Sequence, residues 1–597
     1  MPKFTIKFSA ILMRFLVWRL KHISDNNFLL IVASIIGFTA GLAAVSLKST
    51  VHYVQNLLQR NLDASNINYL YIVYPAIGIL LTILVRKYIV RDTPGHGITR
   101  ILRSISKNSS LIRKRYMLSN MLKSAITVGF GGSVGLEAPI VVTGSAIGSN
   151  FGRFVHLDYK KRTLLIGCGA AGAISAIFNS PIAGVIFAIE VILTEVKINK
   201  FIPILIASVS GQLVSIVLLG DDILFSFKLV DSFVASDTPF YILLGILCGL
   251  ASLYFVRITY YVESSLENVQ NDFVRALFGG LGLAMIIFVL PPIYGEGYDS
   301  IKALLQGKEV EFFSGNFLYT LGDQQIIALS ILLLIIIAKP FATAFTLGSG
   351  GSGGVFAPSL FMGGVTGFFF ARVVQFLSPN TDISTSNFTL VGMCGVMSGV
   401  LHAPLTGIFL IAEITSGYML FVPLMLVSAI SFTTISYFEK YSIYTKMLIE
   451  KGDLIQNDND LLVLNLIDLQ KIIERDLLTI HPDATLKELV ELVKRSRRNI
   501  FPVVNENNEL KGIVTLDHIR EIMFDPDKQY EIIIKTIMQA PPASVSTTEK
   551  MQSVMNKFEK TQAWNLPVID DGQYLGFISK SRIFNAYRKK LIRQAKE

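Results

Sequence analysis

The chain places a single carboxylate at a sharp break inside an apolar segment. In the run Gly135-Leu136-Glu137-Ala138-Pro139, a glycine precedes the acid and a proline follows it. A long straight helix cannot continue through such a run, because glycine lowers helix stability and proline removes a backbone donor. At membrane depth, non-helical backbone is tolerated only where protein buries it or where it lines a wet cavity. We therefore interpret Glu137 as part of an ion pathway, with a glutamate that only satisfies a helix terminus as the alternative.

Composition places most of the chain in a membrane. Hydrophobic residues make up 51% of the 597 residues and charged residues only 16%, and several apolar stretches exceed the ~20 residues that span the hydrocarbon region. The net charge of +10 does not indicate a nucleic-acid partner, because basic residues gather beside apolar stretches, as at 113–115 and 160–162. By the positive-inside rule these loops and the N-terminus are cytoplasmic. We expect a multi-pass protein of the plasma (cell inner) membrane.

A polar stretch that begins near residue 450 divides the chain, since no apolar span follows it. The tail, expected on the cytoplasmic side, twice repeats a helix, a short β-branched strand, a turn and a second strand, which is typical of small α/β modules. In the first copy we expect the helix at 485–494 and the first strand at 500–504. The expected divisions are an interfacial helix at 1–27, a membrane domain at 28–450, a linker at 451–470 and two modules at 471–530 and 531–592.

The membrane domain also repeats its own pattern. Asn179-Ser180-Pro181 and the later Glu190 correspond to His402-Ala403-Pro404 and Glu413, with the same spacing from proline to glutamate. A glycine-rich break lies ahead of each copy. Broken helices at corresponding positions are typical of transporters with inverted repeats, whose substrate site lies at the repeat interface. The predicted fold is an all-α multi-helix membrane domain with two inverted structural repeats, followed by a small α/β pair.

The breaks supply the chemistry of an anion site. A helix N-terminus carries partial positive charge and free N–H groups, so several converging N-termini bind an anion without a full cation. The run 348–356 would present its N–H groups in this way. Such binding is weak and suits rapid passage. Glu137 could itself occupy the site as a tethered anion, and its protonation or displacement would then open the gate.

These motifs resemble the CLC family of chloride channels and chloride/proton antiporters, followed by a tandem pair of CBS domains, over nearly all of residues 28–590. The run around Glu137 is similar to the family's gating-glutamate motif, and Gly354-Val355-Phe356-Ala357-Pro358 is similar to its second signature. The resemblance implies that the backbone N–H groups of Val355 and Phe356 contact the central anion. It also implies that Tyr418 supplies an anion-coordinating hydroxyl.

His96 departs from the family's first motif, which corresponds to Gly95-His96-Gly97-Ile98-Thr99. The family has a serine there, or a proline in some relatives. A neutral imidazole would donate one hydrogen bond to the anion, whereas a protonated one would bind anions tightly and make conduction pH-sensitive. The alternative is a histidine that points to solvent from a glycine turn. Leu136 stands where a basic residue is common, and it either alters the potential near the gate or replaces a structural contact.

Val191 bears on the mechanism. Antiporters of the family commonly carry a proton-relaying glutamate at this place, directly after the position of Glu190, and the family's channels do not. Glu190 and its counterpart Glu413 are expected to support structure. Some antiporters lack the relaying glutamate, and Glu195 lies one turn further along. The favoured function is a gated passive chloride channel with Glu137 as the gate, and the alternative is a proton-coupled antiporter of chloride or another anion.

The tail resembles CBS modules that often bind adenosine nucleotides. Their usual pattern ends the second strand with Ser or Thr and places an Asp three residues later, on the ribose. Thr515 and Ser579 are present, but His518 and Arg582 occupy the Asp positions, with Asp517 adjacent to the first. An adenosine nucleotide held by Thr515, Asp517 and Ser579 is one interpretation, and a structural or dimer-stabilising tail is the other. We expect no further cofactor and no metal.

Two other protein classes fit parts of the pattern. The sequences around Ser133 and Ser352 both satisfy the G-x-S-x-G motif of serine hydrolases, but no strand precedes either serine. A membrane-embedded hydrolase is the remote alternative, and we expect no enzyme. A cation transporter would need several carboxylates in its pathway, whereas this chain offers mainly Glu137. The expected partners are chloride or a similar small anion, protons in the antiporter alternative, membrane lipid, and a second copy of the chain, as the resemblance implies.

Overall fold

The computed structural model describes residues 18–59, 70–91, 97–193, 201–220, 231–313, 316–320, 324–415, 417–450 and 467–596. Most of the expected interfacial helix at 1–27, most of the expected linker at 451–470, His96 and Glu195 lie outside these ranges. The chain forms two compact units, Met1–Leu454 and Ile455–Glu597. Each unit buries hydrophobic side chains of its own.

The first unit is helical in the residues described. Nine of its described helices are long and apolar enough to cross a membrane. The elements of its first half are α2 (Asp25–Gln59), α3 (Leu70–Leu84), the π-helical turn η1 (Val85–Val90), α4 (Gly97–Lys107), α5 (Tyr116–Gly129), α6 (Glu137–Phe154), α7 (Tyr159–Phe178), α8 (Pro181–Phe187), the π-helical turn η2 (Ala188–Ile192) and α9 (Phe201–Leu219).

The second half of this unit repeats long and short apolar helices. Its elements are η4 (Ala235–Asp237), α10 (Thr238–Glu267), α11 (Asp272–Val289), η5 (Pro291–Ile293), α12 (Tyr298–Leu305), α13 (Glu309–Phe313), η6 (Phe317–Thr320), α14 (Gln324–Gly348), α15 (Phe356–Leu377), α16 (Thr385–Leu401), α17 (Pro404–Ile414), α18 (Phe421–Phe438) and α19 (Ile443–Glu450).

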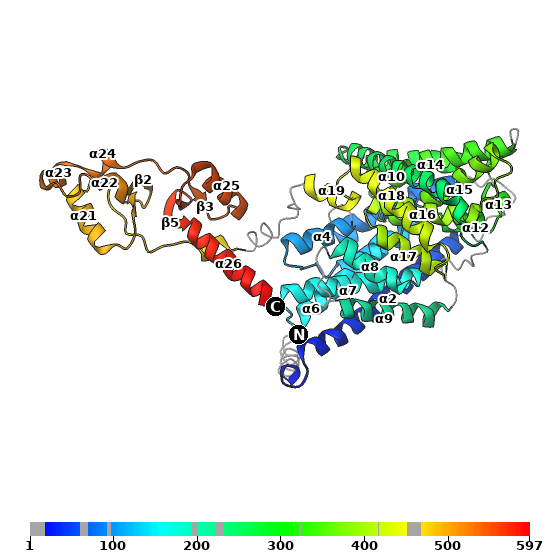
Figure 1. Cartoon of the computed structure of the whole chain (residues 1–597), viewed down its shortest axis with the longest axis horizontal. Coiled ribbons are helices and arrows are strands. Elements are labelled where there is room, and N and C mark those ends of the chain that lie inside the picture. Colours follow the sequence, from blue (N-terminus) through cyan, green and yellow to red (C-terminus); the bar gives the residue numbers. More distant parts are fainter. Residues whose placement is uncertain are drawn as a thin grey trace. The chain divides into compact units, whose positions relative to one another are not determined.

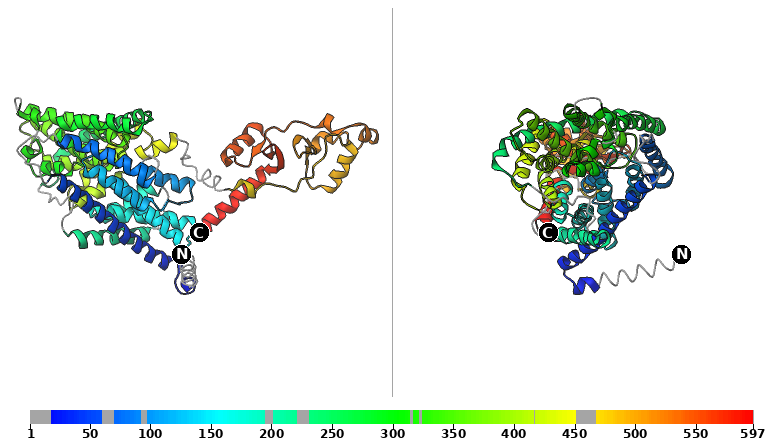
Figure 2. Two further views of the ribbon diagram at one scale, coloured as in Figure 1. Left: turned by 180° about the vertical axis from the view of Figure 1, so that it is seen from behind. Right: turned by 90° about the vertical axis from the view of Figure 1, so that its right-hand side faces the viewer.

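The two halves of this unit share the same pattern of helix packing. Helices α2, α6, α7 and α9 contact one another on one side of the unit, and α10, α14, α15, α16 and α18 contact one another on the other side (Figures 1 and 2). Gly144 of α6 meets Gly169 of α7 so closely that a Cβ on either would overlap the other's carbonyl, and Gly363 of α15 meets Gly392 of α16 in the same way. Small residues let membrane helices approach closely.

The tail contains two small α/β modules. Its elements are η7 (Leu469–Lys471), α21 (Leu486–Arg495), β1 (Ile500–Val504), β2 (Leu510–Thr515), α22 (Leu516–Ile519), α23 (Pro526–Glu531), α24 (Ile534–Ile537), β3 (Val545–Ser546), α25 (Met551–Thr561), β4 (Asn565–Asp570), β5 (Gln573–Ser579) and α26 (Lys580–Lys596). Strands β1 and β2 pair antiparallel, while β4 pairs parallel with β3 and antiparallel with β5. Thr485 and Glu488 form a capping box at the start of α21. The predicted combination of a helical membrane domain with a small α/β tail is confirmed.

Candidate functional site

The two glycine-rich breaks meet each other. The N–H of Gly135 donates to the carbonyl of Gly354 at 2.9 Å, and the N–H of Gly354 donates to the carbonyl of Gly135 at 2.9 Å. A Cβ on Gly354 would lie 2.6 Å from the Cβ of Ala138, so only glycine allows this approach. The helices that follow the breaks, α6 and α15, therefore begin side by side, and the N–H groups of Gly135 and Gly354 satisfy each other's carbonyls.

Side chains support the breaks in the same reciprocal way. The N–H of Ser133 in the first break donates to Thr346 Oγ1 at 3.2 Å, and the N–H of Ser352 in the second donates to Thr127 Oγ1 at 3.0 Å. The two threonines lie on α14 and α5, the helices that precede the opposite breaks. Each repeat thus supplies the hydroxyl that fixes the other repeat's break, as an approximate two-fold relation requires.

Glu137 lies between the two breaks. It is the first residue of α6 and is only 1% exposed. Its Oε1 accepts a hydrogen bond from the hydroxyl of Tyr298, and a Cβ on Gly135 would overlap its Oε2. The side chain therefore folds back over Gly135 toward the start of α15, where the N–H of Ala357 faces the carboxylate. Among the described residues, Oε2 has no hydrogen-bond partner of good geometry.

The N-terminus of α15 is the other half of this arrangement. Val355 is its N-cap residue and Phe356 its first residue, and both are buried. The first N–H groups of a helix have no acceptor within that helix. The ring of Phe356 packs against Phe178 and Phe187, with centroid distances of 5.3 and 6.2 Å. The structure thus brings Glu137, Val355 and Phe356 together, while their contact with an anion stays a prediction.

The structure does not bring Tyr418 to this site, and that assignment needs correction. Tyr418 is 60% exposed and its ring lies edge-on to Phe421. Tyr444, in the first turn of α19, instead lines a cavity of about 10 Å³ beside Val355. Its side chain is buried, and its hydroxyl has no hydrogen-bond partner among the described residues. Both tyrosines follow Glu413 in the sequence, so the motif alone could not decide between them. The direction of α18 determines which tyrosine lies beside Val355.

Thr99 also lines this small cavity and donates to the carbonyl of Tyr444 at 3.3 Å. Thr99 is the last residue of the motif Gly95–Thr99, so the described end of this motif reaches the site, while His96 lies outside the described residues. Glu263 of α10 is the third polar side chain of the cavity and is 3% exposed. Sequence reasoning missed Glu263, since an isolated acid in a long apolar helix was the only signal for it.

Glu190 and Glu413, which follow Pro181 and Pro404, each cap the N-terminus of a short helix in the opposite repeat. Both carboxylate oxygens of Glu413 accept N–H groups at the start of α8, from Ile182 at 3.0 Å and Ala183 at 2.8 Å. Glu190 accepts two N–H groups at the start of α17 in the same manner, at 3.2 and 2.8 Å. The expectation that this pair supports structure is thus met by its contacts. Val191, the next residue, is a buried aliphatic side chain of the core.

Residues 77–436 match the family model described as "Voltage gated chloride channel", and residues 469–525 and 534–589 match the model of the CBS domain. The first match covers more than half of the chain and includes both breaks. The chain belongs to the voltage gated chloride channel (CLC) family.

The relatives of this CLC protein include channels and exchangers. The chloride channel protein CLC-f of Arabidopsis thaliana is 26% identical over 486 residues, which cover 72% of this chain but only 61% of that relative. The H(+)/Cl(-) exchange transporter ClcA of Vibrio parahaemolyticus is 26% identical, with coverage of 66% and 84%. A crystal structure of a eukaryotic CLC transporter has a TM-score of 0.61 at 19% identity and covers 93% of this chain and 97% of its own.

Two further charged side chains of this CLC protein lie near Glu137. Glu296 accepts the N–H of Leu136 at 3.1 Å, and Lys339 of α14 is fully buried. The Lys339 ammonium donates to Ser133 Oγ at 2.9 Å and lies 4.4 Å from the ring centroid of Phe361. Sequence reasoning missed both charges. A signal existed for Glu296, since it is an acid between two glycines, Gly295 and Gly297.

The serines of the two G-x-S-x-G runs have structural partners or lie in the breaks. Ser133 is fully buried, and its hydroxyl donates to the carbonyl of Ile293 at 2.9 Å while accepting from Lys339. That hydroxyl proton is therefore engaged by the carbonyl of Ile293. Ser352 donates its N–H to Thr127 within the second break. These contacts give both serines a structural place in the two breaks.

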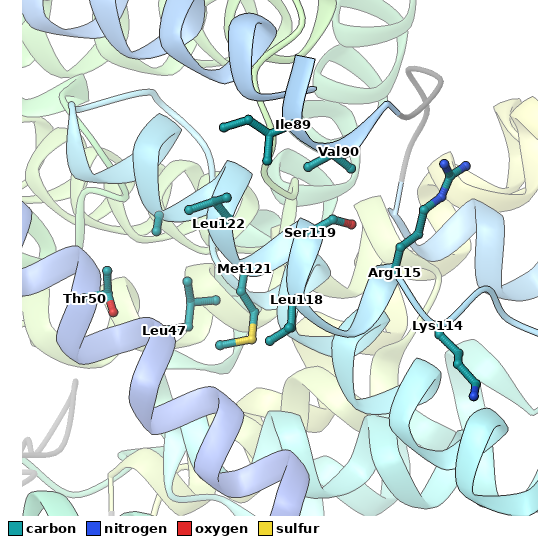
Figure 3. A pocket seen from close by; sticks show the side chains of 11 residues that line it. Leu47, Thr50, Ile89, Val90, Lys114, Arg115, Leu118, Ser119, Met121 and Leu122 are labelled. Carbon is teal, nitrogen blue, oxygen red and sulfur yellow. The ribbon is translucent and has the colours of Figure 1, made fainter. Parts of the chain in front are cut away.

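A larger cavity, of about 590 Å³, opens elsewhere in the membrane unit, among α2, η1 and α5 (Figure 3). Lys114 and Arg115 lie to one side of it, and apolar side chains such as Leu47 and Met121 line the rest. Arg115 Nη1 donates to the carbonyl of Arg91 at 2.9 Å. Its lining contains neither Glu137 nor Val355, so it is separate from the candidate pathway.

The tail's candidate nucleotide residues are partly engaged. Ser579, at the end of β5, donates its hydroxyl to Glu474 at 2.5 Å, and the other oxygen of Glu474 lies 2.6 Å from Arg498 Nη1. Arg498 also binds Asp476 and lowers the pKa of that carboxyl. Asp517 is exposed and pairs with a neighbouring arginine, while Thr515 ends β2. The hydroxyl of Ser579 thus already donates its hydrogen bond to a carboxylate of the tail, Glu474.

Proposed function

We propose that the protein conducts chloride or a similar small anion across the membrane, with the Glu137 carboxylate as the gate. The observation that carries the proposal is the place of that carboxylate, between Gly135 and the first turn of α15. A carboxylate there is a tethered anion at two helix N-termini, where free anions are stabilised. Its protonation or displacement leaves the same N–H groups to a passing anion.

The anion would then contact a second group of donors. The N–H groups of Val355 and Phe356 point from the start of α15, and Tyr444 offers a buried hydroxyl beside Val355. We propose Tyr444 in place of Tyr418, and His96 as a further donor. The N–H groups, the hydroxyl and a neutral imidazole carry no full charge, so binding stays weak enough for rapid release.

Passive conduction is our first choice because Val191 offers no carboxylate where family antiporters carry one. A proton-coupled exchanger is the second candidate, and Glu263 favours it. This acid lines the small cavity beside Val355 and Tyr444, and a cavity of about 10 Å³ has room for about one water. A proton could thus reach the pathway from α10 instead of η2.

The remaining proposals concern surroundings. We propose a plasma-membrane location with a cytoplasmic tail, from the positions of the basic loops, and a homodimer, from the resemblance. Membrane lipid is a fitting partner for the larger cavity, whose apolar walls and flanking Lys114 and Arg115 suit an anionic amphiphile. An adenosine nucleotide at the tail would have to displace Glu474 from Ser579.

The test is reconstitution in liposomes with a chloride gradient and an internal pH reporter. We expect the wild-type protein to release chloride, and Glu137→Gln to raise the rate and remove most of its pH dependence, because the amide cannot ionise. Glu311→Gln, which changes an exposed carboxylate of the same unit, is the control and should leave flux unchanged.

Absence of chloride flux in wild-type vesicles at any pH would contradict the proposed function. Unchanged flux and pH dependence in Glu137→Gln would contradict the gate alone. Uphill proton movement driven by the chloride gradient would contradict passive conduction and support the proton-coupled exchanger.

A further inference from the structure

The larger cavity, among α2, η1 and α5, opens at a surface made of apolar side chains (Figure 3). Leu118 and Ile89, which line it, are 74% and 69% exposed. Both α2 and η1 belong to candidate membrane spans, Asp25–Leu58 and Val73–Val90. The mouth of the cavity therefore faces lipid tails, which are as apolar as these side chains.

The cavity separates α5 from α2 along only part of their length. Toward the end of α5, a Cβ on Gly129 would lie 2.8 Å from the side chain of Val54, so the two helices touch there. Toward the start of α5, the cavity of about 590 Å³ lies between Met121 and Leu47 of α2. Cavities of ~300–1,000 Å³ hold ligands of drug size. A hydrocarbon chain that enters an apolar space of this size gains dispersion contacts with both walls.

One end of the cavity is basic. Of the eleven described side chains that line it, those of Lys114 and Arg115 are cationic and none is acidic. Both residues belong to the run 113–115, which the positive-inside rule places on the cytoplasmic side. Arg115 Nη1 donates to the carbonyl of Arg91, the C-cap residue of η1, at 2.9 Å, which holds the guanidinium beside η1. An anionic head group complements this end, and anionic lipids gather in the cytoplasmic leaflet.

Ser119 adds a polar group next to the basic end. It lies one turn after Arg115 on α5, lines the cavity and is 6% exposed. Its hydroxyl has no hydrogen-bond partner among the described residues. Buried hydroxyls are usually hydrogen-bonded, because an unpaired one costs free energy. A phosphate or ester oxygen of a lipid at this end of the cavity would accept the missing hydrogen bond.

We propose that this cavity binds a phospholipid of the cytoplasmic leaflet with an anionic head group. The phosphate lies at Lys114 and Arg115, next to Ser119, and an acyl chain fills the apolar space between α2 and α5. The inference rests on the membrane location and the lipid partner of the proposed function, but not on anion conduction. The lipid joins the start of α5 to α2 and η1, and so stabilises the helix whose Thr127 accepts the N–H of Ser352 in the second break.

The test follows thermal unfolding of the full chain in detergent while phosphatidylglycerol or phosphatidylcholine is added in matched mixed micelles. A ligand that binds only the folded protein raises the Tm as its concentration increases. We expect the anionic lipid to act at lower concentrations than the zwitterionic one. Lys114→Gln should raise the half-maximal phosphatidylglycerol concentration about fivefold, the effect of one basic residue on an anionic lipid. Arg153→Gln removes an exposed cation at the end of α6, outside the cavity lining, and should change this concentration by less than about twofold, because solvent screens that charge.

Thr50→Trp tests the place of the acyl chain. Thr50 is an exposed residue of α2 at the cavity, so an indole ring there occupies the space without entering the core of the unit. We expect this variant to lose most of the Tm rise that phosphatidylglycerol gives to the wild type. An undiminished rise would overturn the inference.

Three other results would also overturn it. The first is equal half-maximal concentrations of the two lipids for the wild type, and the second is an unchanged phosphatidylglycerol value for Lys114→Gln. The third is an equal Tm rise with soluble glycerol 1-phosphate, which would indicate a site for free phosphate instead of a lipid. None of these measurements uses chloride flux, so their failure is distinguishable from a failure of the proposed function.

Discussion

At the scale of single residues, the site depends on groups whose neighbours come from distant parts of the chain. Glu137 is fixed by Tyr298 and packed against Gly135, while Tyr444 returns from the far end of the membrane unit to Val355. Sequence motifs identified Glu137, Val355 and Phe356 as candidate site residues, because glycines and prolines mark the breaks directly in the sequence. The tyrosine could not be located in this way. Its place depends on the length and direction of α18, which no local pattern encodes.

The tyrosine assignment leads to a prediction that separates two residues of the same type. Tyr444→Phe removes one buried donor beside Val355, and we expect anion affinity in the flux assay to fall by about threefold to tenfold, the worth of about one hydrogen bond. Tyr418→Phe removes an exposed hydroxyl and serves as the matched control. An effect of Tyr418→Phe equal to that of Tyr444→Phe would restore the assignment made from the sequence.

At the scale of elements, the short helices α8 and α17 are held by carboxylates from the opposite repeat. The proline at the start of each supplies no N–H, and the next two N–H groups are taken by Glu413 or Glu190. The repeated Pro-to-Glu spacing made the correspondence visible in the sequence. The exchange between repeats was not visible, because spacing along the chain does not say which helix end a side chain reaches.

Loss of a cap should therefore destabilise the membrane unit. Glu413→Ala leaves the N–H groups of Ile182 and Ala183 without their acceptor, and we expect the free energy of unfolding in detergent to fall by about 1–3 kcal/mol. Glu311→Ala, which breaks an exposed ion pair, should cost less than about 1 kcal/mol. Equal stability of the two variants would show that the cap contributes nothing measurable.

At the scale of the whole molecule, the chain consists of a membrane unit and a tail, each with its own core. The change of composition near residue 450 indicated this division, and strand β1 begins and ends where the pattern predicted it, at Ile500 and Val504. The β-propensity of the residues was enough to predict this strand, because the strand is short, rich in β-branched residues and bounded by turns. Propensity could not predict the contact between Glu474 and Ser579, because these residues lie near opposite ends of the tail sequence.

The division predicts that the pathway survives removal of the tail. A chain that stops after Leu454 keeps Glu137, Glu296, Tyr444 and both breaks, so we expect chloride flux per folded protein within about twofold of the full chain. Flux in liposomes, compared at equal amounts of protein that elute as a single species, is the measurement. A folded truncated protein without flux would make the tail part of the conduction machinery.

The mutual bonds of Gly135 and Gly354 say something about how such a chain can arise. The threonine hydroxyls, the capping carboxylates and the glycine backbone that hold the breaks and short helices of one half all come from the other half. Two copies of a half-length polypeptide could exchange identical bonds about a symmetry axis. Fusion of the copies would then free each position to diverge from its twin. Glu137-Ala138-Pro139 and Phe356-Ala357-Pro358 stand at corresponding places in the two breaks, and only the first of them carries a carboxylate.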